Sequence, residues 1–72
     1  MQLPREFLDR INLKVSRHKH PEKLDWIKIR GKWEAQEGDQ RFVLIHDDHF
    51  GYVIAENKSF GGAVEVEAEL EG

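Results

Sequence analysis

Two stretches of this 72-residue chain alternate apolar and charged side chains with the period of a β-strand. They read Ile27-Lys28-Ile29-Arg30-Gly31-Lys32-Trp33 and Val64-Glu65-Val66-Glu67-Ala68-Glu69-Leu70. Successive side chains of a strand point to opposite faces, so the first stretch presents a row of three cations and the second a row of three anions. Because opposite charges on paired strands attract, we predict that the last strand runs antiparallel beside the first. Either the sheet order 4-1-2-3 or the closure of a barrel would achieve this.

The spacing of the apolar residues predicts one helix followed by four strands. A helix is expected over residues 4–17, where the apolar residues fall on one helical face: Phe7, Leu8, Ile11 and Val15. Residues 11–16 also alternate, which leaves a strand there as an open alternative. Strands are expected at residues 25–36, 40–46, 51–57 and 63–70, with Gly31 indicating a bulge or a close backbone approach inside the first. The sequence thus predicts a single α+β domain over residues 1–72, in which one N-terminal helix packs on a strongly curved four-stranded antiparallel sheet or a small, partly open barrel.

The strand pattern also predicts which side chains form the core. We expect the following to be buried: Phe7, Leu8, Ile11, Ile27, Ile29, Trp33, Val43, Ile45, Val53, Val64 and Val66. The central strand is apolar on both faces, yet the single helix covers only one of them. The other face, which carries Phe42 and Tyr52, needs a cover of its own. We predict a homodimer that packs on this face, with closure of a monomeric barrel as the open alternative.

Composition excludes several classes of protein. The chain has no cysteine, so it has neither disulfides nor thiolate metal sites. Its longest apolar run, residues 42–45, is far shorter than the ~20 residues that span a bilayer, and the first residues lack the apolar core of a signal peptide. We therefore expect a cytoplasmic protein with no membrane partner. Ser16 and Ser59 lie in no nucleophile motif, so we expect no enzymatic activity and no cofactor.

Histidines and aspartates form two short clusters with metal-ligating side chains. Their members are His18, His20, His46, His49, Asp47 and Asp48. Imidazole and carboxylate groups are ligands that zinc accepts, but the spacing matches no standard zinc signature. Exposed turn residues explain the pattern more simply, since an aspartate in a turn accepts hydrogen bonds from its own backbone. Metal binding is therefore only a second alternative function, and no bound metal is predicted.

Two strand faces are candidates for binding a partner. The basic face combines an aromatic side chain with three cations: Trp26, Lys28, Arg30 and Lys32. Proteins that bind single-stranded nucleic acid stack the bases on such aromatic side chains and bind the phosphates with such cations. The acidic face would dock on a basic site of another protein: Glu65, Glu67 and Glu69. The net charge of −3 argues against nucleic acid as the main partner. We therefore predict a small non-enzymatic protein-interaction module, an inhibitor or adaptor that acts through its acidic face on an unidentified protein. A nucleic-acid-binding module is the alternative.

Overall fold

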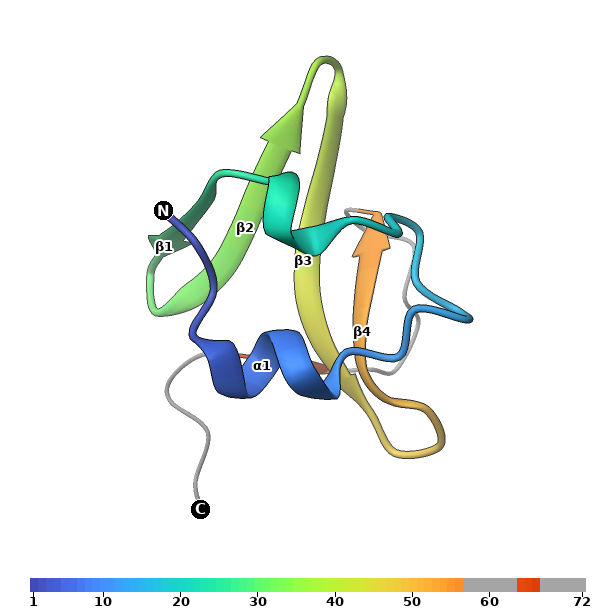
Figure 1. The fold of residues 1–72 in the computed structure, drawn as a ribbon. Coiled ribbons are helices and arrows are strands. Elements are labelled where there is room, and N and C mark those ends of the chain that lie inside the picture. Colours follow the sequence, from blue (N-terminus) through green and yellow to red (C-terminus); the bar gives the residue numbers. More distant parts are fainter. Residues whose placement is uncertain (57–63, 67–72) are drawn as a thin grey trace.

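The computed structural model describes residues 1–56 and 64–66 (Figure 1). Its elements are α1 (Arg5–Arg10), the 3-10 turn η1 (Pro21–Lys23), β1 (Trp26–Ile29), β2 (Lys32–Glu37), β3 (Gln40–Asp47), β4 (Gly51–Glu56) and β5 (Val64–Glu65). The strands form an antiparallel sheet in the order β1-β2-β3-β4, and β5 pairs with β3 outside this path. The predicted α+β class, with one N-terminal helix and an antiparallel sheet, is confirmed. The sheet is not closed into a barrel.

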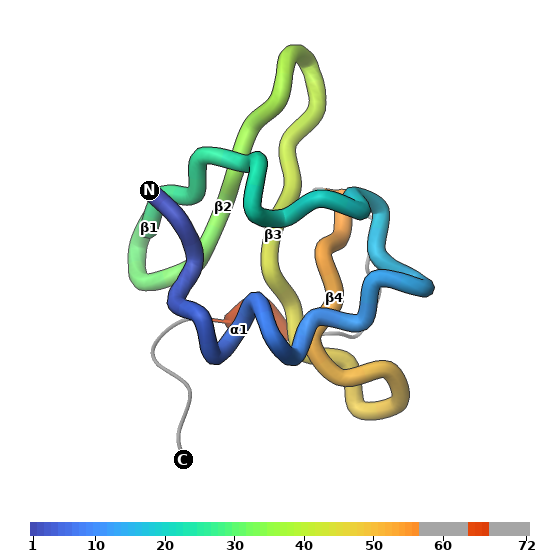
Figure 2. Tube along the Cα trace, viewed as in Figure 1, coloured from blue at the N-terminus to red at the C-terminus, as the bar shows by residue number. Residues whose placement is uncertain are grey.

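The helix is shorter than the sequence predicts. It ends at Arg10, and Ile11 already has extended backbone angles (φ −66°, ψ 129°). The following segment, residues 11–17, runs along the outer edge of β4 (Figures 1 and 2), where Ile11 forms a parallel bridge with Tyr52. The N–H of Asn12 donates to the carbonyl of Tyr52 at 2.8 Å. Pairing with the sheet edge therefore takes the backbone groups that a longer helix would have used, and residues 11–16 form neither the expected helix nor a full strand.

The predicted strand over residues 25–36 is in fact a hairpin. Arg30 and Gly31 form a two-residue turn with φ of 54° and 80°, the left-handed pair typical of a type I′ hairpin turn. Gly31 thus supplies a turn residue rather than the expected bulge. The turn pairs Trp26 with Ala35 and Lys28 with Trp33, and paired residues share a face of the sheet.

Most buried side chains lie on the face of the sheet that α1 covers. This main core consists of Leu3, Phe7, Ile11, Leu24, Trp26, Trp33, Ala35, Phe42, Leu44 and Ile54. The ring of Phe7 meets that of Tyr52 edge to face, with 5.5 Å between centroids. A smaller buried cluster occupies the opposite face: Val43, Ile45, Val53 and Ala55.

The expected core is confirmed at six positions: Phe7, Ile11, Trp33, Val43, Ile45 and Val53. Leu8 and Val66 are partly buried against it. Three positions are wrong, since Ile27, Ile29 and Val64 are 48%, 41% and 67% exposed. The face assignment of the central strand was reversed, because α1 covers the side that carries Phe42 and Tyr52. The expected dimer face therefore lies in the core of a single chain. The homodimer remains a prediction, but this face cannot be its interface.

The final strand pairs with β3 and not with β1. It meets the predicted first strand only in the part that forms β2, where the Trp33 N–H donates to the Val66 carbonyl at 3.4 Å. Ile45 lies opposite Glu65, and His46 lies opposite Val64. The predicted order 4-1-2-3 is wrong because β2 pairs only with residues 40–43 of β3 and leaves the rest of that edge to β5. One part of the charge match is present, since Lys32 Nζ lies 3.0 Å from Glu65 Oε2. Glu67 and Glu69 lie outside the described residues.

Candidate functional site

The outer edge of the sheet at β1 exposes two isoleucines. Within the residues that the structure describes, β1 pairs only with β2. Ile27 and Ile29 are 48% and 41% exposed and lie on the face opposite α1. Their neighbours across the hairpin are Glu34 and Lys32. We call residues Trp26–Arg30, with these two side chains, the β1 edge.

The backbone of the β1 edge points partly outward. The pair Ile29–Lys32 closes the two-residue turn and is hydrogen-bonded. Because hydrogen-bonded and non-hydrogen-bonded pairs alternate along an antiparallel ladder, the backbone groups of Ile27 and Ile29 bond to β2. The backbone groups of Trp26 and Lys28 point away from β2. The N–H of Trp26 confirms this direction, since it donates outward to the carbonyl of Met1 at 2.7 Å. Figure 2 shows the N-terminus beside β1. Among residues 1–56 and 64–66, nothing pairs with the N–H and carbonyl of Lys28.

The three cations of the predicted basic row lie apart. Lys28 shares a face with Trp33, and its Nζ lies 5.2 Å from the centroid of that ring, within the range of a cation–π interaction. Lys32 lies on the opposite face and pairs with Glu65. Arg30 occupies the turn and is exposed. The turn has therefore divided the expected row between the two faces of the sheet.

Trp26 is not an exposed stacking platform. Its side chain is 0% exposed, and its Nε1–H donates to the carbonyl of Pro21 at 3.0 Å. A base cannot stack on a ring that is fully buried. The expected nucleic-acid face therefore lacks its aromatic member.

The two histidine clusters lie at opposite ends of β3. His18 packs edge to face on Phe42, with ring centroids 5.0 Å apart, and its Nε2 lies 3.2 Å from Glu37 Oε1. Its Nδ1 accepts the backbone N–H of His20 at 3.1 Å, which places the ring proton on Nε2 as the donor to Glu37.

The other two histidines belong to the end of β3 that leads into β4. His46 packs on Tyr52, and His49 packs on Phe50. In the part of the chain that the structure describes, no three His, Asp or Glu side chains come close enough to hold a metal ion. The four histidines are thus not brought together into one set of ligands.

Asp47 closes the turn between β3 and β4. Its Oδ1 accepts the backbone N–H groups of His49 at 2.7 Å and of Phe50 at 3.0 Å. These hydrogen bonds hold the pKa of Asp47 below its usual range, because they stabilise the charged carboxylate. Asp47 therefore acts as a turn residue.

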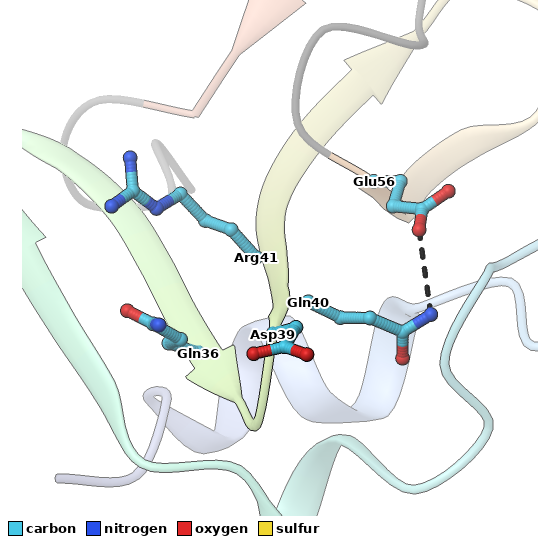
Figure 3. Close-up of a pocket in the computed structure, with 5 residues that line it drawn as sticks. All are labelled: Gln36, Asp39, Gln40, Arg41 and Glu56. Carbon is cyan, nitrogen blue, oxygen red and sulfur yellow. Dashed lines mark hydrogen bonds between the residues drawn. The ribbon is translucent and has the colours of Figure 1, made fainter.

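An open polar depression lies beside the turn that joins β2 to β3. It has a volume of about 360 Å³ and is lined by Gln36, Asp39, Gln40, Arg41 and Glu56 (Figure 3). The side chains of Gln40 and Glu56 point toward each other, and Gln40 Nε2 lies 3.4 Å from Glu56 Oε1. Arg41 points away from them, and its Nε lies 3.5 Å from Glu34 Oε1. Gln40 and Glu56 thus bond to each other, and the lining includes no serine, threonine, cysteine or histidine.

Sequence reasoning missed the exposed isoleucines. The signal that could have located them is Gly31. A dipeptide that ends in glycine and lies between two alternating segments also fits a two-residue hairpin turn, and Arg30-Gly31 is such a dipeptide. The depression gave no sequence signal, since its residues come from a hairpin tip and from the end of β4.

Known proteins give no guide to this chain. No protein-family model matches it, and neither a curated protein nor a solved structure does. In residues 1–56 and 64–66, no helix has the length and apolar character needed to cross a membrane. The site must therefore be interpreted from its own geometry.

Proposed function

We propose that this chain is a small protein-interaction module that binds its partner through the β1 edge. The observation that carries the proposal is the exposure of Ile27 and Ile29 beside the open backbone of Lys28. An edge strand with exposed apolar side chains readily pairs with other chains, and proteins usually cover such an edge. This chain does cover its other edge, because residues 11–17 bond along β4. The contrast between the two edges supports a binding role for β1.

A non-enzymatic role is supported by the state of the hydroxyl group at position 16. Ser16 is 3% exposed, and its Oγ donates to the carbonyl of Asn12 at 2.6 Å and accepts the N–H of Ile54 at 3.1 Å. Its hydroxyl group therefore links two segments of the chain and is too deeply buried to contact a substrate. The other serine, Ser59, lies outside the described residues.

The acidic face has a smaller part in the proposed binding site than the sequence predicts. The carboxylate of Glu65 forms an ion pair with Lys32, which neutralises part of the charge of that face. The proposal therefore keeps the class of protein-interaction module, an inhibitor or adaptor, and assigns the main contact to the β1 edge.

A paired substitution tests the proposal. In the variant Ile27→Thr/Ile29→Thr, both side chains stay β-branched but lose much of their apolar surface, so the strand is kept while the contact is weakened. Burying an isoleucine in an interface contributes about 1.5–3 kcal/mol, so partner binding should fall at least about tenfold. Retention of the native partner by the tagged chain, measured at several concentrations, gives the affinity.

The matched control is Leu13→Thr/Val15→Thr. Both of these side chains are 41% exposed, as Ile29 is, but they lie on the segment after α1. The control variant should bind like the wild type, and circular dichroism should show both variants folded. Equal retention by the two variants and the wild type would contradict the assignment of the partner site to β1.

A further inference from the structure

We propose that the partner segment is an extended acidic strand that adds to the outer edge of β1 opposite Lys28. This inference rests on the proposed function and names the chemistry of the partner. It predicts a short sequence in which an acidic residue stands between two apolar residues. Strand addition of this kind draws its affinity from main-chain hydrogen bonds and its specificity from alternate side chains.

The backbone of Lys28 sets the register. Its N–H and carbonyl both point outward, and an antiparallel strand satisfies such a pair with the two groups of one opposing residue. The neighbouring outward N–H, that of Trp26, is already bonded to the Met1 carbonyl. The N-terminal segment therefore blocks the edge at Trp26, and the added strand extends from the position beside Ile27 toward the turn at Arg30.

The side chains of the β1 edge set the sequence of the added strand. The residue opposite Lys28 lies on the same face as the Lys28 ammonium, where a carboxylate forms a favourable cross-strand pair. Its two neighbours lie on the other face, beside Ile27 and Ile29, where β-branched apolar side chains bury the exposed surface. Arg30, exposed in the turn, adds a second cation at this end of the edge.

Charge also argues against a second copy of the chain at this edge. Because Trp26 is already bonded, a two-fold antiparallel pairing of β1 with itself would centre on Lys28. The two ammonium groups would then lie directly opposite each other, an arrangement that destabilises a strand pair. A strand that presents a carboxylate at this position avoids the repulsion.

The test is a titration of the ¹⁵N-labelled chain with short peptides, followed by its amide NMR signals. The acidic peptide acetyl-Val-Glu-Val-Glu-Val-amide should shift the Lys28 amide downfield as its hydrogen bond forms. The lysine peptide acetyl-Val-Lys-Val-Lys-Val-amide should bind at least tenfold more weakly. An acidic peptide that is N-methylated at both glutamates should also bind at least tenfold more weakly, because it lacks the N–H groups that pair with β1.

Charge reversal supplies the matched variants. Lys28→Glu should weaken the acidic peptide at least tenfold and strengthen the lysine peptide. The control Lys23→Glu reverses an exposed lysine of η1, away from the β1 edge, and should leave both peptides unchanged.

The outcomes separate this inference from the proposed function. Equal binding of the methylated and unmethylated peptides would overturn strand addition, and equal binding of the acidic and lysine peptides would overturn the charge rule. Failure of the acidic peptide to bind, while Ile27→Thr/Ile29→Thr still releases the native partner, would overturn the acidic strand and leave the β1 edge as the binding site. Self-association of the free chain in sedimentation, abolished by Ile27→Thr/Ile29→Thr, would show that the occupant is a second copy.

Discussion

Replacing Ser16 by alanine should remove the connection that holds residues 11–17 against β4. Ser16 Oγ links two segments of the chain, because it donates to the carbonyl of Asn12 and accepts the N–H of Ile54. The carbonyl of Ile54 accepts the N–H of Arg17 at 2.8 Å, so the same edge position is bonded through both of its backbone groups. One hydroxyl group thus takes the place of a backbone carbonyl in the pairing of this edge.

The expected cost follows from the burial of the two partners. Asn12 is partly exposed, so water can replace the hydroxyl at its carbonyl, and that loss is about 0.5–1.5 kcal/mol. Ile54 is 0% exposed, so its N–H is left buried without an acceptor, which costs about 1–3 kcal/mol. The free energy of unfolding should therefore fall by about 2–4 kcal/mol, a large share of the 5–15 kcal/mol typical of a domain.

Urea unfolding and amide hydrogen exchange measure the effect. At a urea dependence of about 1 kcal/mol per molar, the unfolding midpoint of Ser16→Ala should fall by about 2–4 M. The Ile54 amide should also exchange faster relative to the amides of β3. Val15→Ala is the control, because its side chain is 41% exposed and makes no such link. If the Ser16→Ala midpoint moves no more than that of the control and the Ile54 amide stays protected, the reasoning is refuted.

Three further predictions concern the turns and the core. Trp26→Phe should destabilise the fold by about 1–2 kcal/mol more than Trp33→Phe. Trp26 Nε1–H bonds to the Pro21 carbonyl, whereas the buried Trp33 Nε1–H has no hydrogen-bond partner among the described residues. Urea midpoints compare the two variants, and equal losses would contradict the prediction. Arg30→Asn should stabilise the hairpin by about 0.5–1 kcal/mol, because asparagine tolerates the left-handed conformation better than arginine; an unchanged or lower melting temperature would count against the turn. Asp47→Ala should lose stability at neutral pH. Because folding lowers the pKa of Asp47, its contribution is present above about pH 4 and lost as the pH falls through the folded pKa. Unfolding curves at pH 7 and pH 3 should show the difference from wild type shrinking in acid, and a constant difference would refute the linkage.

The strands in the middle of the chain follow directly from local sequence. Expected strands at residues 40–46 and 51–57 match β3 and β4 to within one residue at each end. Both are dense in β-branched and aromatic residues and are bounded by turn residues, such as Glu37-Gly38-Asp39. Local preference and tertiary packing agree there, so the pattern is sufficient.

The N-terminal segment shows where local sequence stops being sufficient. Residues 11–16 have a helical apolar spacing, yet the side chains of Asn12 and Ser16 bond to the backbone of Phe50 and Ile54, 38 positions away in sequence. Asparagine and serine compete with helix formation through their side chains, and both use that ability here. The sequence shows that Asn12 and Ser16 are able to do this, but not that the edge of β4 lies within their reach.

The candidate site could not be predicted for a related reason, which is the change of face at a two-residue turn. In a continuous strand, Ile27, Ile29 and Trp33 would share one face, as their odd numbers suggest. In the hairpin, paired residues share a face, and each even-numbered residue of β1 pairs with an odd-numbered residue of β2, as Lys28 does with Trp33. The predicted inner and outer faces are therefore correct for β2 and reversed for β1. Arginine rarely adopts the left-handed conformation of this turn, which is why the pattern favoured an unbroken strand. The same reversal buries Trp26, exposes Ile27 and Ile29 and separates Lys28 from Lys32, so the turn that misleads the sequence interpretation also creates the apolar β1 edge that we propose as the binding site.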